Sequence, residues 1–70
     1  MQWDKVIHKS ARTEDGQQVG YIAADDDESI IILASEFREY NVPKSHVKAF
    51  NGSQVYLDFP SNKLEQYRIA

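Results

Sequence analysis

The chain has 70 residues, a net charge of −3 and no cysteine. This length fits one domain, and the missing cysteine excludes disulfides and thiolate metal sites. Hydrophobic residues make up 41% of the chain and charged residues 27%, which is typical of a folded domain rather than a disordered one. Basic residues form no patch of the kind that grips a phosphate backbone. The longest apolar stretch, residues 30–34, is far shorter than a membrane span, and residues 1–5 lack the apolar run of a signal peptide, so we expect a cytoplasmic protein.

Short extended segments separated by turn residues predict an all-β fold. Strands are expected at residues 5–12, 17–24, 29–35, 36–42, 47–50 and 54–59. Asp15-Gly16 and Asn51-Gly52 are tight-turn signals, because glycine adopts positive φ at little cost. Gly20 inside the second segment predicts a bulge or a sharp bend.

Proline residues mark the ends of two predicted strands. A single helical turn is expected at residues 43–46, and a short helix, capped by Ser61 or Asn62, at residues 61–68. Its apolar residues Leu64 and Tyr67 are three positions apart, so we expect this helix to pack against the sheet.

Alternation of side chains predicts which strand faces form the core. Val55, Leu57 and Phe59 share one face of the last strand, where alternation is clearest. Residues 30–33 form a continuous apolar strand, a pattern typical of strands covered on both sides. We expect one side to face the interior and the other to be covered by the C-terminal segment or by a second subunit.

The order of these features resembles the PRC-barrel family. The resemblance runs over residues 5–59 and rests on Asp15-Gly16, residues 19–22, the acidic turn at residues 25–27, the apolar strand at residues 30–33, residues 42–47 and residues 54–58. It implies a six-stranded, partly open antiparallel β-barrel with a short C-terminal helix. It also implies a binding module without catalytic residues, such as an adaptor in archaeal cell division or envelope assembly. The alternative is an RNA- or ribosome-associated barrel of the ribosome-maturation type.

Four consecutive carboxylates, Asp25 to Glu28, are the most conspicuous charged feature. Hard cations bind oxygen ligands, but the spaced ligands and internal glycine of a calcium loop are missing. We therefore interpret the run as a solvated turn. His8 and His46 lie far apart in the chain, and no cysteine or nearby carboxylate completes a zinc site. We expect neither a metal nor a cofactor.

Catalytic motifs are also missing from the sequence, which contains no nucleophile elbow, P-loop or dinucleotide-binding glycine motif. So small a barrel is expected to leave little room for a substrate cleft. We therefore expect no enzymatic activity and no small-molecule substrate.

Aromatic and arginine side chains are the candidate interface residues, because tryptophan, tyrosine and arginine are enriched in binding hot spots. The candidates are Trp3, Arg38, Tyr40, Phe50 and Tyr56. The competing interpretation is that these rings pack in the core. We expect a protein partner or a homodimer, formed through an outer apolar face or an exposed strand edge.

Overall fold

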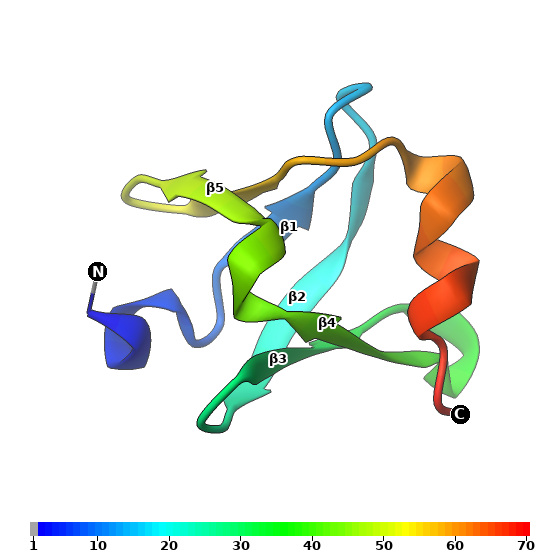
Figure 1. Ribbon diagram of the computed structural model, residues 1–70, viewed down its shortest axis with the longest axis horizontal. Coiled ribbons are helices and arrows are strands. Elements are labelled where there is room, and N and C mark those ends of the chain that lie inside the picture. The colour runs from blue at the N-terminus through cyan, green and yellow to red at the C-terminus, as the bar shows by residue number, and fades with distance from the viewer. Residues whose placement is uncertain (1) are drawn as a thin grey trace.

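The computed structural model describes residues 2–70, which form one six-stranded sheet in the order β4-β3-β2-β1-β6-β5 (Figure 1). The strands are β1 (Ser10–Arg12), β2 (Gln18–Asp25), β3 (Ser29–Leu33), β4 (Glu39–Pro43), β5 (Val47–Phe50) and β6 (Gln54–Leu57). Short 3₁₀ helices η2 (Ser35–Phe37) and η3 (Lys44–His46) connect strands, while η1 (Trp3–Val6) precedes the sheet and η4 (Ser61–Tyr67) follows it. The prediction of a mostly β fold is confirmed.

The sheet is mixed, so the prediction of a wholly antiparallel sheet is wrong. β1 pairs antiparallel with β2 but parallel with β6, where Ser10 lies opposite Gln54 and Ala11 opposite Val55. The chain leaves β4 through η3 and forms the β5–β6 hairpin, which brings β6 alongside β1 in the same direction. Parallel pairing requires such a long crossover and leaves no local sequence signal.

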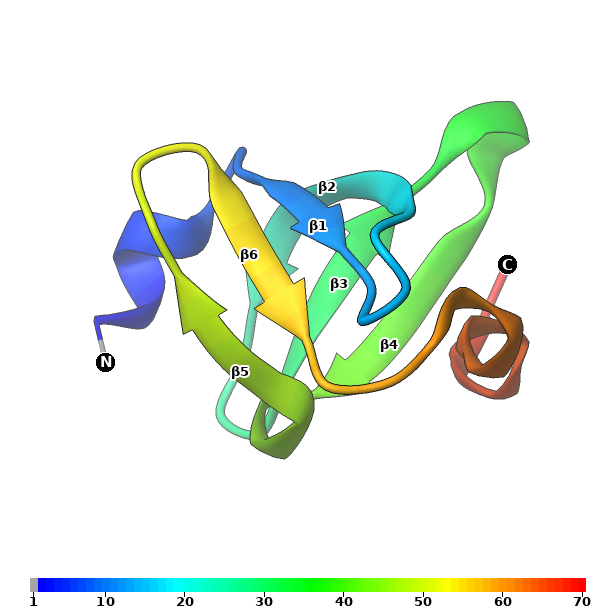
Figure 2. The same ribbon diagram turned by 90° about the horizontal axis from the view of Figure 1, so that it is seen from above.

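The two end strands of the sheet do not pair with each other. Within residues 2–70, no ladder of hydrogen bonds joins β4 to β5, so the sheet is not closed. It nevertheless curls around its interior, with β5 and β6 on one side and β3 and β4 on the other (Figure 2). Among the same residues, no helix is long and apolar enough to cross a membrane.

Two predicted strands are shorter than expected because a helical turn replaces part of each. Residues 5–12 begin with the end of η1, which buries Val6 completely, and His8 then takes a positive φ of 73°. Residues 36–42 begin inside η2, where Glu36 and Phe37 both have φ of 62°. The remaining predicted strands are confirmed to within two residues at either end.

Eleven buried apolar side chains form the core. They are Val6, Ala11, Ile22, Ile30, Ile32, Tyr40, Val42, Val55, Leu57, Phe59 and Leu64. The predicted core face of the last strand is therefore confirmed. In β3 the burial alternates, with Ile30 and Ile32 buried while Ile31 and Leu33 on the outer side are half-buried. The inner side of β3 is therefore buried as predicted, whereas its outer side is only partly covered.

The C-terminal segment packs on the sheet as predicted, through Leu64, which is 6% exposed. It forms a 3₁₀ helix without a side-chain cap, and the Ser61 hydroxyl donates to Asp15 instead. Beyond the helix, the chain runs along the free edge of β4. The Ile69 amide donates to the Glu39 carbonyl at 2.8 Å, so part of that edge is covered by the chain itself.

Candidate interaction surface

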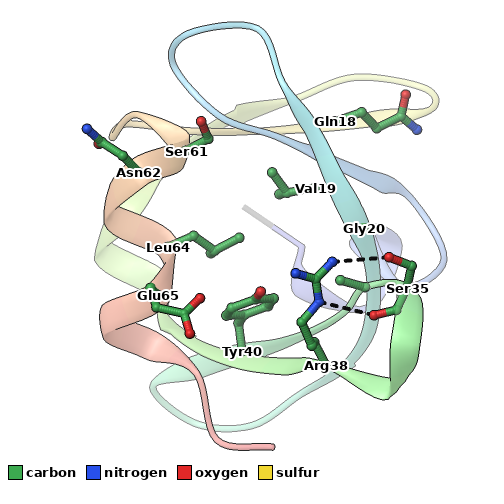
Figure 3. A pocket seen from close by; sticks show the side chains of 11 residues that line it. Gln18, Val19, Gly20, Ser35, Arg38, Tyr40, Ser61, Asn62, Leu64 and Glu65 are labelled. Atoms are coloured by element: carbon green, nitrogen blue, oxygen red, sulfur yellow. Dashed lines mark hydrogen bonds between the residues drawn. The ribbon is translucent and has the colours of Figure 1, made fainter.

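A hollow of about 520 Å³ opens between β2, the start of β4 and η4 (Figure 3). Its apolar lining is Val19, Gly20, Ala34, Tyr40 and Leu64, and its polar lining is Gln18, Ser35, Arg38, Ser61, Asn62 and Glu65. This volume falls in the range of about 300–1,000 Å³ seen for ligand pockets. We expected little room for a cleft in so small a fold, and the hollow is larger than expected because η4 leaves space beside β2 and the start of β4.

A β-bulge in β2 forms one wall of this hollow. Ala11 pairs with Gly20 and Arg12 with Gln18, so Val19 is the extra residue in the ladder. Figure 3 shows the Val19 side chain directed into the hollow. Gly20 has φ of 147°, and a Cβ at this position would overlap the Leu33 carbonyl group of β3. The bulge predicted from Gly20 is thus confirmed, and only glycine fits there.

Arg38 stands on the rim of the hollow in a fixed position. Its Nε donates to the Ser35 carbonyl at 3.2 Å and its Nη2 donates to Ser35 Oγ at 3.1 Å. Figure 3 shows the remaining guanidinium nitrogen directed toward the hollow, with Glu65 on the opposite rim. Glu65 Oε1 accepts from Arg68 Nη1 at 3.2 Å, an exposed pair within one helical turn. The hollow therefore has a positive rim on the β4 side and a negative rim on the η4 side.

The η2 turn, which borders the hollow through Ser35, displays an aromatic ring to solvent. Phe37 is 94% exposed, although phenylalanine side chains are normally buried in a core. Glu36 and Phe37 both occupy the left-handed region, which costs about 1–2 kcal/mol for each non-glycine residue. The chain thus holds Phe37 outward in an unfavourable backbone conformation.

Two further exposed apolar side chains lie on the outer face at this end of the sheet. Tyr21 is opposite Leu33 in the β2–β3 ladder, and Leu33 is opposite Glu39 in the β3–β4 ladder. Ile69 bonds to Glu39 through its backbone, so these residues form one row across the strands. Tyr21 is 45% and Ile69 55% exposed. Phe37 lies two residues before Glu39 in the chain, in the η2 turn that leads into β4.

Only two of the five predicted interface residues come together at the hollow. Arg38 lies on its rim, and Tyr40 lies on its floor. Tyr40 is only 3% exposed and belongs to the core, so its side chain offers little area to a partner unless the hollow is entered.

The other three predicted residues lie elsewhere and are half-buried. Trp3 packs on the core with Lys44 Nζ 4.8 Å from its ring centre. Phe50 packs on the core with Lys9 Nζ 5.7 Å from its ring centre. Tyr56 lies on β6. These contacts favour the packing interpretation for Trp3 and Phe50.

Phe37 was not among the predicted interface residues, although the sequence carries a weak signal for it. In the predicted strand at residues 36–42, Phe37 falls on the side of Glu39 and Asn41, opposite Tyr40 and Val42. An aromatic residue on the polar side of a strand indicates an exposed ring. The hollow itself leaves no such signal, because it depends on how η4 packs across the sheet.

His46 is the centre of a polar cluster outside the hollow. Its Nδ1 lies 2.9 Å from Asp58 Oδ1 and its Nε2 lies 3.2 Å from the Tyr67 hydroxyl, while Phe59 packs edge-on against its ring. An aspartate, histidine and tyrosine in this order resemble a proton relay. None of them lines the hollow that could hold a substrate. The cluster links η3, the end of β6 and η4 through hydrogen bonds, so it helps to hold these three segments together.

Residues 26–28 of the acidic run form the turn between β2 and β3, while Asp25, also predicted in the turn, is the last residue of β2. Asp26 Oδ1 accepts from the Ser29 hydroxyl at 2.9 Å and from the backbone amides of Ser29 and Glu28. These hydrogen bonds, above all that from the Ser29 side chain, lower the pKa of Asp26. Among residues 2–70, no group of three histidine, aspartate or glutamate side chains is arranged to hold a metal ion.

A second carboxylate ties the β1–β2 turn to η4. Asp15 accepts hydrogen bonds from the Thr13 hydroxyl and from the hydroxyl and backbone amide of Ser61. These bonds, with that from Thr13 the strongest influence, lower the pKa of Asp15 to about 2. Because Ser61 also lines the hollow, this link holds the start of η4 in place as one of its walls.

Comparisons with protein-family models, with curated proteins and with solved structures found no match. The fold and the surface together define a small β-sheet protein with a partly apolar hollow beside a protruding aromatic ring.

Proposed function

We propose that the chain is a non-enzymatic protein-interaction module that works as a cytoplasmic adaptor through the surface around η2. One observation carries this proposal: Phe37 is 94% exposed in a turn of left-handed residues. Both the backbone conformation and the exposed ring are unfavourable for the isolated chain. A partner that buries the ring would offset these costs, since aromatic anchors in pockets dominate interface energetics.

The resemblance to the PRC-barrel family supports the same proposal. Six strands in a strongly curled sheet and a short C-terminal helix are compatible with a partly open barrel of this type. Members of the family act as binding modules, and an adaptor role in archaeal cell division or envelope assembly follows by analogy.

The chemistry of the hollow favours binding over catalysis. Its ionisable lining residues are Arg38, Tyr40 and Glu65, and Ser35 bonds to Arg38 rather than to a general base. The negative side chains Glu36 and Glu65 at this surface, with the net charge of −3, disfavour a nucleic-acid partner.

Affinity purification with three tagged baits tests the proposal. The baits are the unchanged chain, Phe37→Ser, and Lys48→Ser as a control at an exposed position on β5. We expect a protein recovered in stoichiometric amount with the unchanged chain and the control, and lost with Phe37→Ser. Equal recovery with all three baits would show that the η2 surface does not bind the partner.

A further inference from the structure

We propose that the partner which fits the η2 surface is a second copy of this chain, with Phe37 of each copy inserted into the hollow of the other. This inference rests on the proposed function, because it requires the η2 surface to be an interaction surface.

The protruding ring and the hollow are neighbours on one surface. Two residues near Phe37 in the chain line the hollow: Arg38, which follows it, and Ser35, two positions before it. A two-fold axis that passes between ring and hollow brings each ring onto the hollow of the opposite copy. Such an isologous contact uses the same patch twice and closes as a dimer, without leading to filaments.

The hollow is large enough to admit a phenylalanine side chain, and its apolar walls suit one chemically. Its volume is about 520 Å³, and Val19, Tyr40 and Leu64 give it apolar walls. Figure 3 shows these three side chains around the interior of the hollow. A buried phenylalanine removes about 150–250 Å² from water and gains from an edge-on contact with another ring, which Tyr40 can supply.

Charge complementarity supports the same two-fold arrangement. Arg38 follows Phe37 directly, so insertion of the ring carries this guanidinium to the mouth of the opposite hollow. The far rim of that hollow carries Glu65 (Figure 3). Each dimer would thus contain two reciprocal pairs between Arg38 and Glu65. Glu65 contacts Arg68 within its own copy, but exposed pairs of this type are weak and exchange at little cost.

Sedimentation equilibrium of the purified chain tests the inference. We expect a dimer for the unchanged chain and for the Lys48→Ser control. Phe37→Ser removes the ring, and Val19→Trp places a bulky indole where the ring would enter the hollow, so both variants should be monomers. Loss of a hot-spot ring from both halves of the interface raises the dissociation constant about a thousandfold.

Mixing the two monomeric variants separates this geometry from a general loss of folding. Phe37→Ser retains the hollow and Val19→Trp retains the ring, so the mixture should form a heterodimer with one ring in one hollow. Its dissociation constant should exceed that of the unchanged dimer about thirtyfold, since one of two equal contacts is lost. Charge reversal gives a second check, because Arg38→Glu and Glu65→Arg should each weaken the dimer and their combination should restore it.

The inference is overturned if the unchanged chain is a monomer at every concentration, if Phe37→Ser remains a dimer, or if the mixture of variants stays monomeric. In one outcome the unchanged chain is a monomer but recovers a different protein in affinity purification, and the Phe37→Ser bait does not recover it. This outcome would refute the dimer and leave the proposed function intact. If Phe37→Ser changed neither the oligomeric state nor the set of recovered proteins, the dimer and the proposed function would both be refuted.

Discussion

Replacing Gly20 with alanine is expected to destabilise the fold more than any other glycine substitution in the chain. Gly20 has φ of 147°, which side chains rarely adopt, and an added Cβ would overlap the Leu33 carbonyl oxygen, with the carbonyl carbon at 2.9 Å. Strained backbone costs about 1–3 kcal/mol, and overpacking against a rigid strand adds about 1–3 kcal/mol. The expected loss is about 3 kcal/mol or more of the free energy of unfolding.

The other two glycines provide matched controls. Gly16 has φ of 83° but nothing within 4 Å of an added Cβ, so alanine there should lose about 1 kcal/mol from backbone strain alone. Gly52 has open space and no positive φ, so alanine there should change the free energy of unfolding by less than about 0.5 kcal/mol.

Urea denaturation followed by circular dichroism measures all three variants. A domain of 70 residues has a total stability of about 4–10 kcal/mol, so the loss at Gly20 should move the midpoint strongly or abolish the transition. An equal loss for Gly16→Ala and Gly20→Ala would refute the reasoning, because it would mean that the close approach of β2 to β3 contributes nothing.

Further predictions concern the turn that displays the ring, the helix and a carboxylate. Glu36→Gly removes the steric strain of a side chain in the left-handed region and should raise the free energy of unfolding, measured by urea denaturation, by about 0.5–1 kcal/mol. No gain in this free energy would mean that Glu36 is unstrained. Phe37→Ser should change it by less than about 0.5 kcal/mol when measured at monomeric concentrations, because the ring is 94% exposed. Leu64→Ala should cost about 2–5 kcal/mol, since its side chain fixes η4 in the core, and a loss below 1 kcal/mol would contradict that placement. The pKa of Asp15 is lowered from 3.8 to about 2. The contribution of its carboxylate to the free energy of unfolding is therefore complete above about pH 4 and is lost as the pH falls from about 4 to about 2. Asp15→Asn should therefore flatten the stability profile in that pH window, and an unchanged profile would contradict the assigned hydrogen bonds.

Local signals in the sequence predict much of the sheet. The Asn51-Gly52 turn lies between β5 and β6, and alternation in β6 identifies its core face. Gly20 predicts the bulge, and Leu64 predicts the packing side of the last helix. Each of these features depends on residues close together in the chain, which is why the pattern is sufficient.

Long-range features could not be predicted in the same way. The parallel pairing of β1 with β6 and the open gap between β4 and β5 depend on the path of the whole chain. The η1 helix forms where burial of Val6 outweighs a weak strand pattern. Glu36 and Phe37 are poor candidates for left-handed backbone, so the η2 turn has no compositional signal. For the candidate surface, Arg38 was therefore predicted while its neighbour Phe37 was not.

The two unfavourable features of η2 occur at the same residue, and this coincidence is the strongest argument for binding. A glycine or asparagine would adopt the left-handed turn at lower cost, and a polar side chain would be more favourable in water. Phe37 fulfils neither condition, and its ring gives the isolated fold almost no buried area. The adjacent hollow has apolar walls, and Val19, Tyr40 and Leu64 border a space that no side chain of the described residues fills. A contact that buries such a ring in the hollow would offset the costs of the exposed ring and the left-handed turn, so the ring and the hollow are best explained together.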